Sequence, residues 1–281
     1  MKKLFALLLS AGMLLSMTSC SSSKVDDDAL TALEDGLNQI ENMESAMYDA
    51  NMGMDVEGEK ANIGLHGGYL EKDGKLNFSM IIDAEEDGTS VDNMFEIYYK
   101  DDRLFIQFLG DKYQMDMNEL LDLMEDTEDE PEQTEKKEKA FKKEEIKPYL
   151  TKASMDGNTI LLEFDNKKVQ EALKESIEQA KQTYGYDMEV KVKKTSAQVE
   201  IKDGFIVDGN FTCNINMIVK DESNNSGAGN MQIVFTLKFD QINQNKDLEF
   251  PDFKDYEETD LFTLITKLMP IDGQDPTGLN A

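Results

Sequence analysis

The sequence predicts an α+β fold in which a curved antiparallel sheet carries amphipathic helices on its concave face. Two stretches, residues 26–48 and 166–184, place apolar residues three and four apart, which is the spacing of a helix with one apolar stripe. Most other segments alternate apolar and polar residues between tight turns, which indicates antiparallel strands with one buried face. Strands that follow one another in runs exclude a βαβ array. The apolar strand faces need cover, and the helices can provide it.

The first helix is expected over residues 26–48. Asp26 to Asp28 suit a helix start, because the helix dipole favours negative charge there. Gly36 weakens the helix without ending it. The apolar stripe consists of Leu30, Leu33, Leu37, Ile40, Met43 and Met47.

Strands are expected in the rest of the first half. Met52, Met54 and Val56 alternate with polar residues or glycine, and a second alternation runs from Leu76 to Ile82. Residues 95–117 predict a compact meander of three strands joined by tight turns. All strand pairs are expected to be antiparallel.

The middle of the chain changes character. Residues 118–125 predict a short helix, and residues 126–140 have almost no apolar side chain, which predicts an inserted acidic surface loop. Phe141 to Leu150 predicts another short helix, which ends near Pro148.

The second half begins with a strand at Thr159 to Phe164 and a helix that runs through Tyr184, capped by Asp165 or Asn166. Asp203-Gly204 is a hairpin turn signal. Further strands are expected at residues 188–192, 197–201, 205–219 and 231–239, then a short helix at 261–268 and a flexible tail at 269–281.

The N-terminus has the three parts of a signal peptide. Lys2 and Lys3 precede an apolar run, Leu4 to Met17, whose fourteen residues are fewer than the ~20 that span a membrane. Small residues then lead to Cys20. We therefore expect a signal peptide at 1–19, a tether at 20–25 and a single domain at 26–268. A signal peptide in which Cys20 is incidental is the alternative.

The leader resembles the lipobox of bacterial lipoproteins, with Met17 where leucine is commonest. The resemblance implies that acyl chains on Cys20, such as palmitate, hold the protein at the outer face of the cell membrane. Stable anchoring of this kind needs more than a single acyl chain.

The chain is strongly acidic, with a formal net charge of −29, and loss of Lys2 and Lys3 makes it more so. Such a chain should not attract nucleic acid or anionic headgroups. Once Cys20 is acylated, Cys213 has no partner for a disulfide. It lies on the apolar side of an alternating strand, so we expect a buried, inert thiol, with a reactive thiol as the alternative.

Catalytic and metal signatures are absent from the sequence. His66 is the only histidine, and neither a Gly-x-Ser-x-Gly elbow nor a phosphate loop occurs. The acidic segments 122–130 and 252–260 lack the spacing of an EF-hand and are interpreted as solvated surface. We expect no enzyme activity, no cofactor and no metal, with His66 at the surface in a strand or turn.

The order of elements resembles the superfamily of bacterial outer-membrane lipoprotein carriers and the related LppX/LprG-like lipoproteins. The similarity is locally strongest in Phe95 to Met117, which begins FEIYYKDDRLFIQF, and in Pro251 to Glu258, PDFKDYEE. It implies an unclosed β-barrel with helices over a hydrophobic cavity that holds acyl chains. Only Cys20, as the lipid attachment site, carries over as a functional residue.

Methionine is abundant, with 17 in the chain, and it suits a surface that re-packs around varied apolar ligands. A core that uses methionine as filler is the alternative. The candidate hydrophobic pocket comprises Leu37, Ile40, Met47, Met52, Met54, Phe78, Met80, Ile106, Phe108, Met115, Met217 and Phe235.

Two functions therefore stay open for what we expect to be a monomer anchored to the membrane through its acyl chains. One is a binder or carrier of a lipid or other hydrophobic ligand. The other is a cell-envelope interaction module with a filled core that acts through its acidic surface loops.

Overall fold

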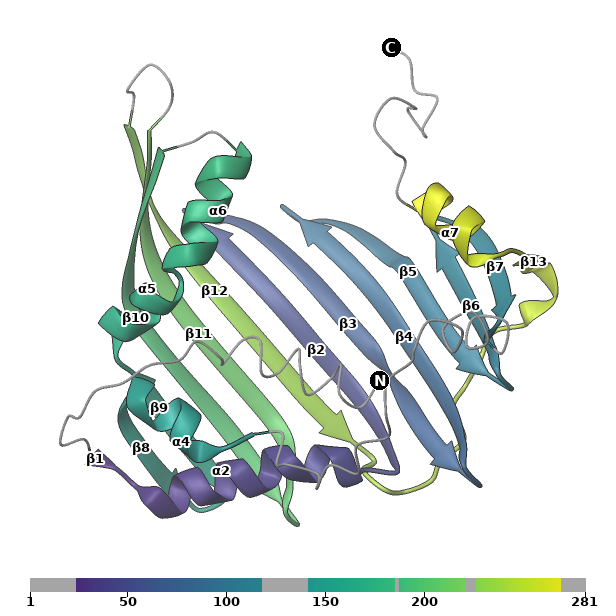
Figure 1. Ribbon diagram of the computed structural model, residues 1–281, viewed down its shortest axis with the longest axis horizontal. Helices are drawn as coiled ribbons and strands as arrows, with labels where there is room; N and C mark the ends of the chain where they lie inside the picture. The colour runs from purple at the N-terminus through teal and green to yellow at the C-terminus, as the bar shows by residue number, and fades with distance from the viewer. Residues whose placement is uncertain (1–23, 118–140, 185–186, 221–225, 269–281) are drawn as a thin grey trace, which may run out of the picture.

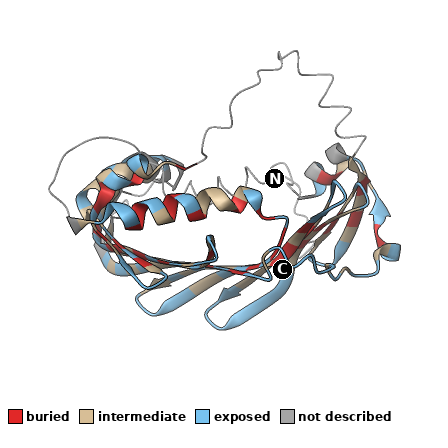
Figure 2. Ribbon diagram, turned by 90° about the horizontal axis from the view of Figure 1, so that it is seen from below, coloured by how far each residue is buried: buried red, intermediate tan, exposed pale blue. Residues whose placement is uncertain are grey.

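The computed structural model describes residues 24–117, 141–184, 187–220 and 226–268. They form one sheet of thirteen strands in the order β1-β8-β9-β10-β11-β12-β2-β3-β4-β5-β6-β7-β13 (Figure 1). The sheet curves without closing, and helices lie on its concave side (Figure 2). The predicted α+β class with an unclosed, barrel-like sheet is confirmed.

The first half of the sheet is a continuous meander with two-residue turns. Residues with positive φ occupy these turns, for example Asp73-Gly74, as hairpins of this length require. The strands are β2 (Ser45–Val56), β3 (Glu59–Lys72), β4 (Lys75–Glu86), β5 (Thr89–Lys100), β6 (Arg103–Phe108) and β7 (Asp111–Asp116).

The second half joins the first through β12, which pairs with β2. Asp203-Gly204 forms the predicted turn between β10 and β11, with both residues at positive φ. The strands are β8 (Leu150–Asp156), β9 (Thr159–Phe164), β10 (Asp187–Lys202), β11 (Phe205–Lys220) and β12 (Ser226–Asp240).

Two short edge strands correct the expectation that every strand pair is antiparallel. β1 (Lys24–Val25) pairs in parallel with β8, and β13 (Glu257–Glu258) pairs in parallel with β7. Each has only two residues and is far in sequence from the strand it pairs with, so no tight hairpin dictates its direction.

Helix α2 (Asp27–Gln39), extended by η1 (Ile40–Asn42), packs on the concave face. The carboxylate of Asp26 accepts a hydrogen bond from the Asp28 amide and caps the helix. The predicted helix 26–48 was too long, because the chain enters β2 at Ser45, where it pairs with β3, and from Met47 onward it pairs with β12 as well. Met43 therefore lies beyond the helix and Met47 within a strand.

The described residues also form the helices α4 (Lys143–Ile146), α5 (Asn166–Ala172), α6 (Lys174–Tyr184) and α7 (Leu261–Leu268), with the short turns η2 (Lys147–Tyr149) after α4 and η3 (Phe253–Asp255) before β13. Asp165 caps α5 by accepting from two backbone amides. The helix predicted through Tyr184 is interrupted at Leu173. The short helices predicted at 141–150 and at 261–268 are present.

Ion pairs hold α2 against α4. The Asp27 carboxylate lies 2.7 Å from Lys143 Nζ and 2.6 Å from Lys147 Nζ. The hydrogen bonds from these two ammonium groups lower the pKa of Asp27 to about 2. Asn38 adds two hydrogen bonds to the backbone of Phe141.

A strap formed by residues 241–256 crosses the convex face from the end of β12 towards β7. It packs aromatic rings on the outward side chains of β5 and β6, with Phe253 stacked on Phe105 at a centroid distance of 3.8 Å. Burial raises the pKa of Tyr256 in this cluster to about 12. The strap thus covers part of the outer face that no described helix reaches.

Several predictions fall outside the described residues. These are the signal peptide at 1–19, Cys20 and most of its tether, the short helix at 118–125, the acidic loop at 126–140 and the tail at 269–281.

Gly67 is a position where the fold tolerates no side chain. The side chain of Tyr48 passes over Gly67, and its hydroxyl donates a 2.6 Å hydrogen bond to the Ser79 carbonyl. A Cβ at Gly67 would lie 2.1 Å from the Ser79 oxygen. We expect Gly67→Ala to lower the free energy of unfolding by about 2 kcal/mol, the scale of overpacking, in a urea titration.

Gly209→Ala is the matched control, because its added Cβ would meet only the Leu237 oxygen at 3.9 Å. Equal stability of the two variants would contradict the contact described at Gly67.

Candidate hydrophobic binding face

The strand register aligns apolar side chains in rows across the concave face. One row joins Phe211, Phe235, Met52, Ile63 and Ala84, and the next joins Leu237, Ala50, Leu65, Ile82 and Phe95. Because side chains alternate between faces with period two, the polar residues of the same strands point to the convex side. The concave side of the central strands is therefore apolar from β11 to β5.

Helices bury the two ends of this concave face. Beneath α2, Leu30 and Leu33 are fully buried against residues such as Ile160 of β9. At the far end, Leu264 of α7 packs on Ile106, Tyr113 and Met115. Each end is thus a packed core.

Within the described part of the chain, the middle of the concave face is incompletely covered. Met52, Met54 and Ile63 keep 49%, 42% and 43% of their surface exposed, although they lie side by side on β2 and β3. We call these three residues, with the half-buried Leu65, Ile82, Ile233 and Phe235 around them, the open face. The helices lie on this same concave side of the sheet (Figure 2). The space beneath α2 is filled, and the accessible apolar surface lies beyond the helix.

The structure places the twelve pocket residues in several surroundings. Met52, Met54 and Phe235 belong to the open face. Leu37, Ile40, Phe78 and Met80 pack in the adjoining cluster around Met43. Ile106 and Met115 lie under α7. The ring of Phe108 packs against that of Phe95, with 5.9 Å between the ring centroids. Met217 is half-buried on β11.

Met47 was wrongly placed in this group. It follows the concave residue Ala46 by one position in β2, so its side chain points to the convex face. There its Sδ approaches Gly68 beside Leu248 of the strap. Its helical spacing from Met43 is a coincidence of sequence.

Ile63 and Leu65 are open-face residues that sequence reasoning missed. They lie on β3, where Gly64, Gly67 and Gly68 interrupt the apolar alternation that indicates a strand. The alternation of Ile63 and Leu65 with Gly64 and His66 was the only local sign of a strand. His66 itself is half-exposed on the convex face, with Nδ1 3.2 Å from Asp83 Oδ2, as expected of a surface strand residue.

Cys213 is buried on β11, with 4% of its surface exposed and its Sγ 3.6 Å from the Thr195 hydroxyl. Burial raises the pKa of this thiol, so little thiolate forms at neutral pH. The expected burial of Cys213 is confirmed, and its inertness stays a prediction.

Comparisons with known proteins find distant likenesses among solved structures. No family model and no curated protein matches the chain. Among solved structures, the lipoprotein LppX of Mycobacterium tuberculosis is 11% identical, with a TM-score of 0.36, over 80% of this chain and 100% of its own. LprF of Mycobacterium bovis is 10% identical, with a TM-score of 0.33, over 82% of this chain and 99% of its own. These values carry no conclusion about ligand or activity.

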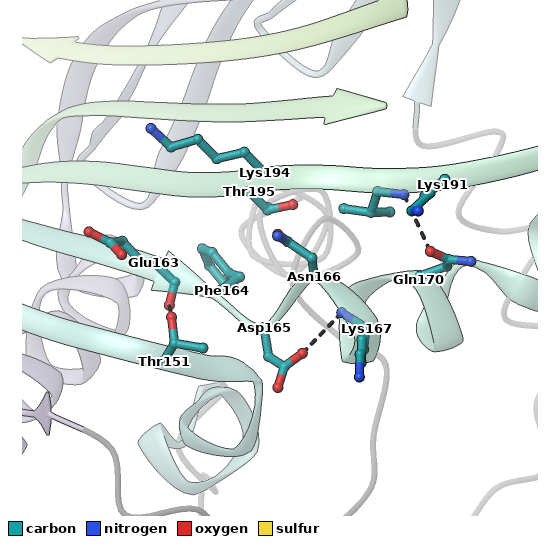
Figure 3. Close-up of a pocket in the computed structure, with 11 residues that line it drawn as sticks. Thr151, Glu163, Phe164, Asp165, Asn166, Lys167, Gln170, Lys191, Lys194 and Thr195 are labelled. Atoms are coloured by element: carbon teal, nitrogen blue, oxygen red, sulfur yellow. Dashed lines mark hydrogen bonds between the residues drawn. The ribbon is translucent and has the colours of Figure 1, made fainter. Parts of the chain in front are cut away.

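A hollow of about 610 Å³ lies where β10 extends past the end of β9 (Figure 3). Side chains of α5 replace the missing neighbouring strand: Asn166 donates to the Lys193 carbonyl, and Gln170 accepts from the Val192 amide. Lys167, Lys191 and Lys194 give the hollow a polar lining, unlike the open face. It is a consequence of protecting a strand edge.

Within the described ranges, no group of three or more His, Cys, Asp or Glu side chains is arranged to hold a metal ion. No helix among the described residues is long and apolar enough to cross a membrane.

Thiol labelling can report the exposure of the open face. We expect a cysteine in Met54→Cys to react with iodoacetamide at pH 8 in the folded protein, whereas Cys213 in the same molecule reacts only after unfolding. The reason is that Met54 is 42% exposed and Cys213 4%. Peptide mass spectrometry of the alkylated protein measures both sites. Equal protection of the two thiols would mean that the open face is covered.

Proposed function

We propose that the protein is a lipoprotein, held by acyl chains on Cys20 at the outer face of the cell membrane, that binds a lipid or other hydrophobic ligand on the open face. The observation that carries this proposal is the exposure of Met52, Met54 and Ile63 in one contiguous patch of the concave side. No catalytic role is proposed.

The energetics of apolar surface support a ligand at this position. Leaving apolar surface in water costs about 25 cal/mol per Å². A ligand chain that lies along the rows recovers this free energy without making specific polar contacts. Flexible thioether side chains at Met52 and Met54 can adapt to chains of different shape, which favours a class of ligands over one molecule.

The proposed anchor supports access to lipid. Cys20 precedes Lys24 of β1 by four residues, a distance of at most about 14 Å in an extended chain. Since β1 pairs with β8, that edge of the sheet would be held close to the bilayer. A ligand leaving the membrane would then have a short path to the concave face.

The second candidate is an envelope interaction module that works through its acidic loops, for which a filled space beneath α2 is expected. A packed core at one end is compatible with either function, whereas a patch of exposed methionine and isoleucine has no role in a module of acidic loops. We therefore favour the ligand-binding function.

Ligand binding can be tested with a charge placed on the open face. We expect Met52→Asp to weaken binding of a fluorescent fatty amphiphile at least tenfold, because a ligand chain would have to desolvate the new carboxylate. Asn51→Asp is the matched control, since it adds the same charge one residue away on the opposite face and should bind like the wild type. Fluorescence titration measures both affinities.

Native mass spectrometry of the wild type should also detect co-purified acyl species. The ligand-binding proposal would be contradicted if the protein carried no acyl species and did not bind the fluorescent probe. Equal loss of probe affinity in the two variants would contradict it as well.

The anchor is tested separately. Cells fed an alkyne analogue of palmitate should label the wild type and leave Cys20→Ala unlabelled, and the variant should be released from the membrane fraction. Labelling that persists in Cys20→Ala would show that this residue is not the attachment site.

A further inference from the structure

Strand β10 directs two lysines to the hollow beside α5, Lys191 and Lys194, which lie towards opposite ends of it in Figure 3. In a regular strand, residues three positions apart point to opposite faces of the sheet. A register shift between Val192 and Lys194 changes this, so that Lys191 pairs with Asn216 and Lys194 with Asn214, two positions apart. The two lysines therefore share one face. Bulges re-aim side chains in this way beside functional sites.

A third lysine of the lining, Lys167, comes from α5. We call Lys167, Lys191 and Lys194 the hollow lysines. Among the residues that the structure describes, none of the three forms an ion pair. The chain has 58 acidic and only 29 basic residues, so acidic partners are plentiful in its composition. The charge of the hollow lysines nevertheless stays unneutralised within this part of the chain.

Two carboxylates also line the hollow, and both are engaged by other groups. Glu163 Oε1 lies 3.7 Å from Lys152 Nζ, and Lys152 is outside the lining. Asp165 accepts hydrogen bonds from two backbone amides at the start of α5. Neither carboxylate is paired with a hollow lysine.

Protection of a strand edge explains the hollow but not its charge. Lysines can guard such an edge against pairing with another chain. Here the backbone of β10 is already bonded, because Asn166 donates to the Lys193 carbonyl and Gln170 accepts from the Val192 amide. The hollow lysines are therefore available to another partner.

The net charge of −29 does not prevent an anion from binding at this place. At physiological ionic strength, exposed charges are largely screened beyond about 8 Å. An anion inside the hollow therefore interacts mainly with the hollow lysines, whose long flexible stems let the ammonium groups move towards it. Each ammonium group offers three donors and no acceptor, so the complementary ligand is an acceptor with negative charge.

A phosphate monoester meets these requirements. Its phosphate group carries about 1.5 to 2 negative charges at neutral pH and three strong acceptor oxygens, whereas a carboxylate carries one charge. The hollow, at about 610 Å³, also has the size of a small-molecule site and leaves room for the esterified part. The Gln170 amide and the Thr151 hydroxyl in the lining suit a polar group there.

We propose that the hollow beside α5 binds a phosphate monoester, with the hollow lysines around its phosphate group. The monoester is either a free metabolite or the headgroup of a lipid. The lining shares no residue with the open face, so this site does not depend on the ligand proposed there.

The test is a calorimetric titration of the full-length protein in a neutral detergent with sn-glycerol 3-phosphate. We expect binding to the wild type and at least tenfold weaker binding to the double variant Lys191→Gln/Lys194→Gln, because two charge-assisted contacts are lost. Lys167→Gln, on the helix, should weaken binding as well. Melting temperatures of the variants should equal that of the wild type.

Lys75→Gln/Lys202→Gln is the matched control, since it removes the same charge at two exposed lysines outside the hollow. It should bind sn-glycerol 3-phosphate like the wild type. Met52→Asp, on the open face, should do so too, which separates this site from the proposed hydrophobic ligand.

Dihexanoyl phosphatidic acid presents the same monoester as a lipid headgroup. If it binds more tightly than sn-glycerol 3-phosphate and the double variant abolishes that binding, the natural ligand is a headgroup. Weaker binding of the lipid assigns the hollow to a free ester. The proposal is overturned if neither compound binds at millimolar concentration, if sulfate binds as tightly as the ester, or if the control variant loses as much affinity as the double variant.

Discussion

The concave face of the thirteen-stranded sheet presents more apolar surface than the helices α2 and α7 can cover. At about 4.8 Å between neighbouring strands, twelve intervals extend about 58 Å along the curved sheet. Helix α2, with 13 residues, is about 20 Å long. Among the described residues it therefore covers one end and α7 covers the other, and Met52, Met54 and Ile63 on the strands between them stay exposed.

This constraint explains why the apolar residues fall into separate clusters. They lie beneath α2, around Met43 on the central strands, between α5 and strands β10 to β12, beneath α7, and between the strap and the convex side of β5 and β6. Stability thus comes from these clusters and from the backbone ladder that joins them. The open face contributes little packing of its own, so its methionines can rearrange around an occupant without loosening the fold.

Much of the fold could be predicted from the sequence, because the alternation of apolar and polar residues in strands and the three- and four-residue spacing of apolar residues in helices are strong local signals. The Asp203-Gly204 turn and the strand around Cys213 are examples. The end of the first helix could not be predicted in this way. Met43 and Met47 continue the helical stripe, and only pairing with β3 and β12, far along the chain, draws Ser45 onward into a strand.

The same limit applies to the candidate site. Apolar side chains on strands could be assigned to a face, but which of them α2 or α7 would bury depends on helix length and position. Phe78 and Ile106 have the same alternating pattern as Met52, yet they are buried and Met52 is not. Glycine-rich β3 gave too weak a signal to reveal Ile63.

Methionine methyl groups provide the most direct test of the central claim that the open face binds an amphiphile. In a ¹³C-methyl-methionine NMR spectrum, a spin-labelled fatty amphiphile should broaden the signals of Met52 and Met54. The signal of Met47, on the convex face of the same strand, should stay sharp, as should that of the buried Met43. Broadening of Met47 to the same extent, or sharp signals from Met52 and Met54 at saturating amphiphile, would contradict the account.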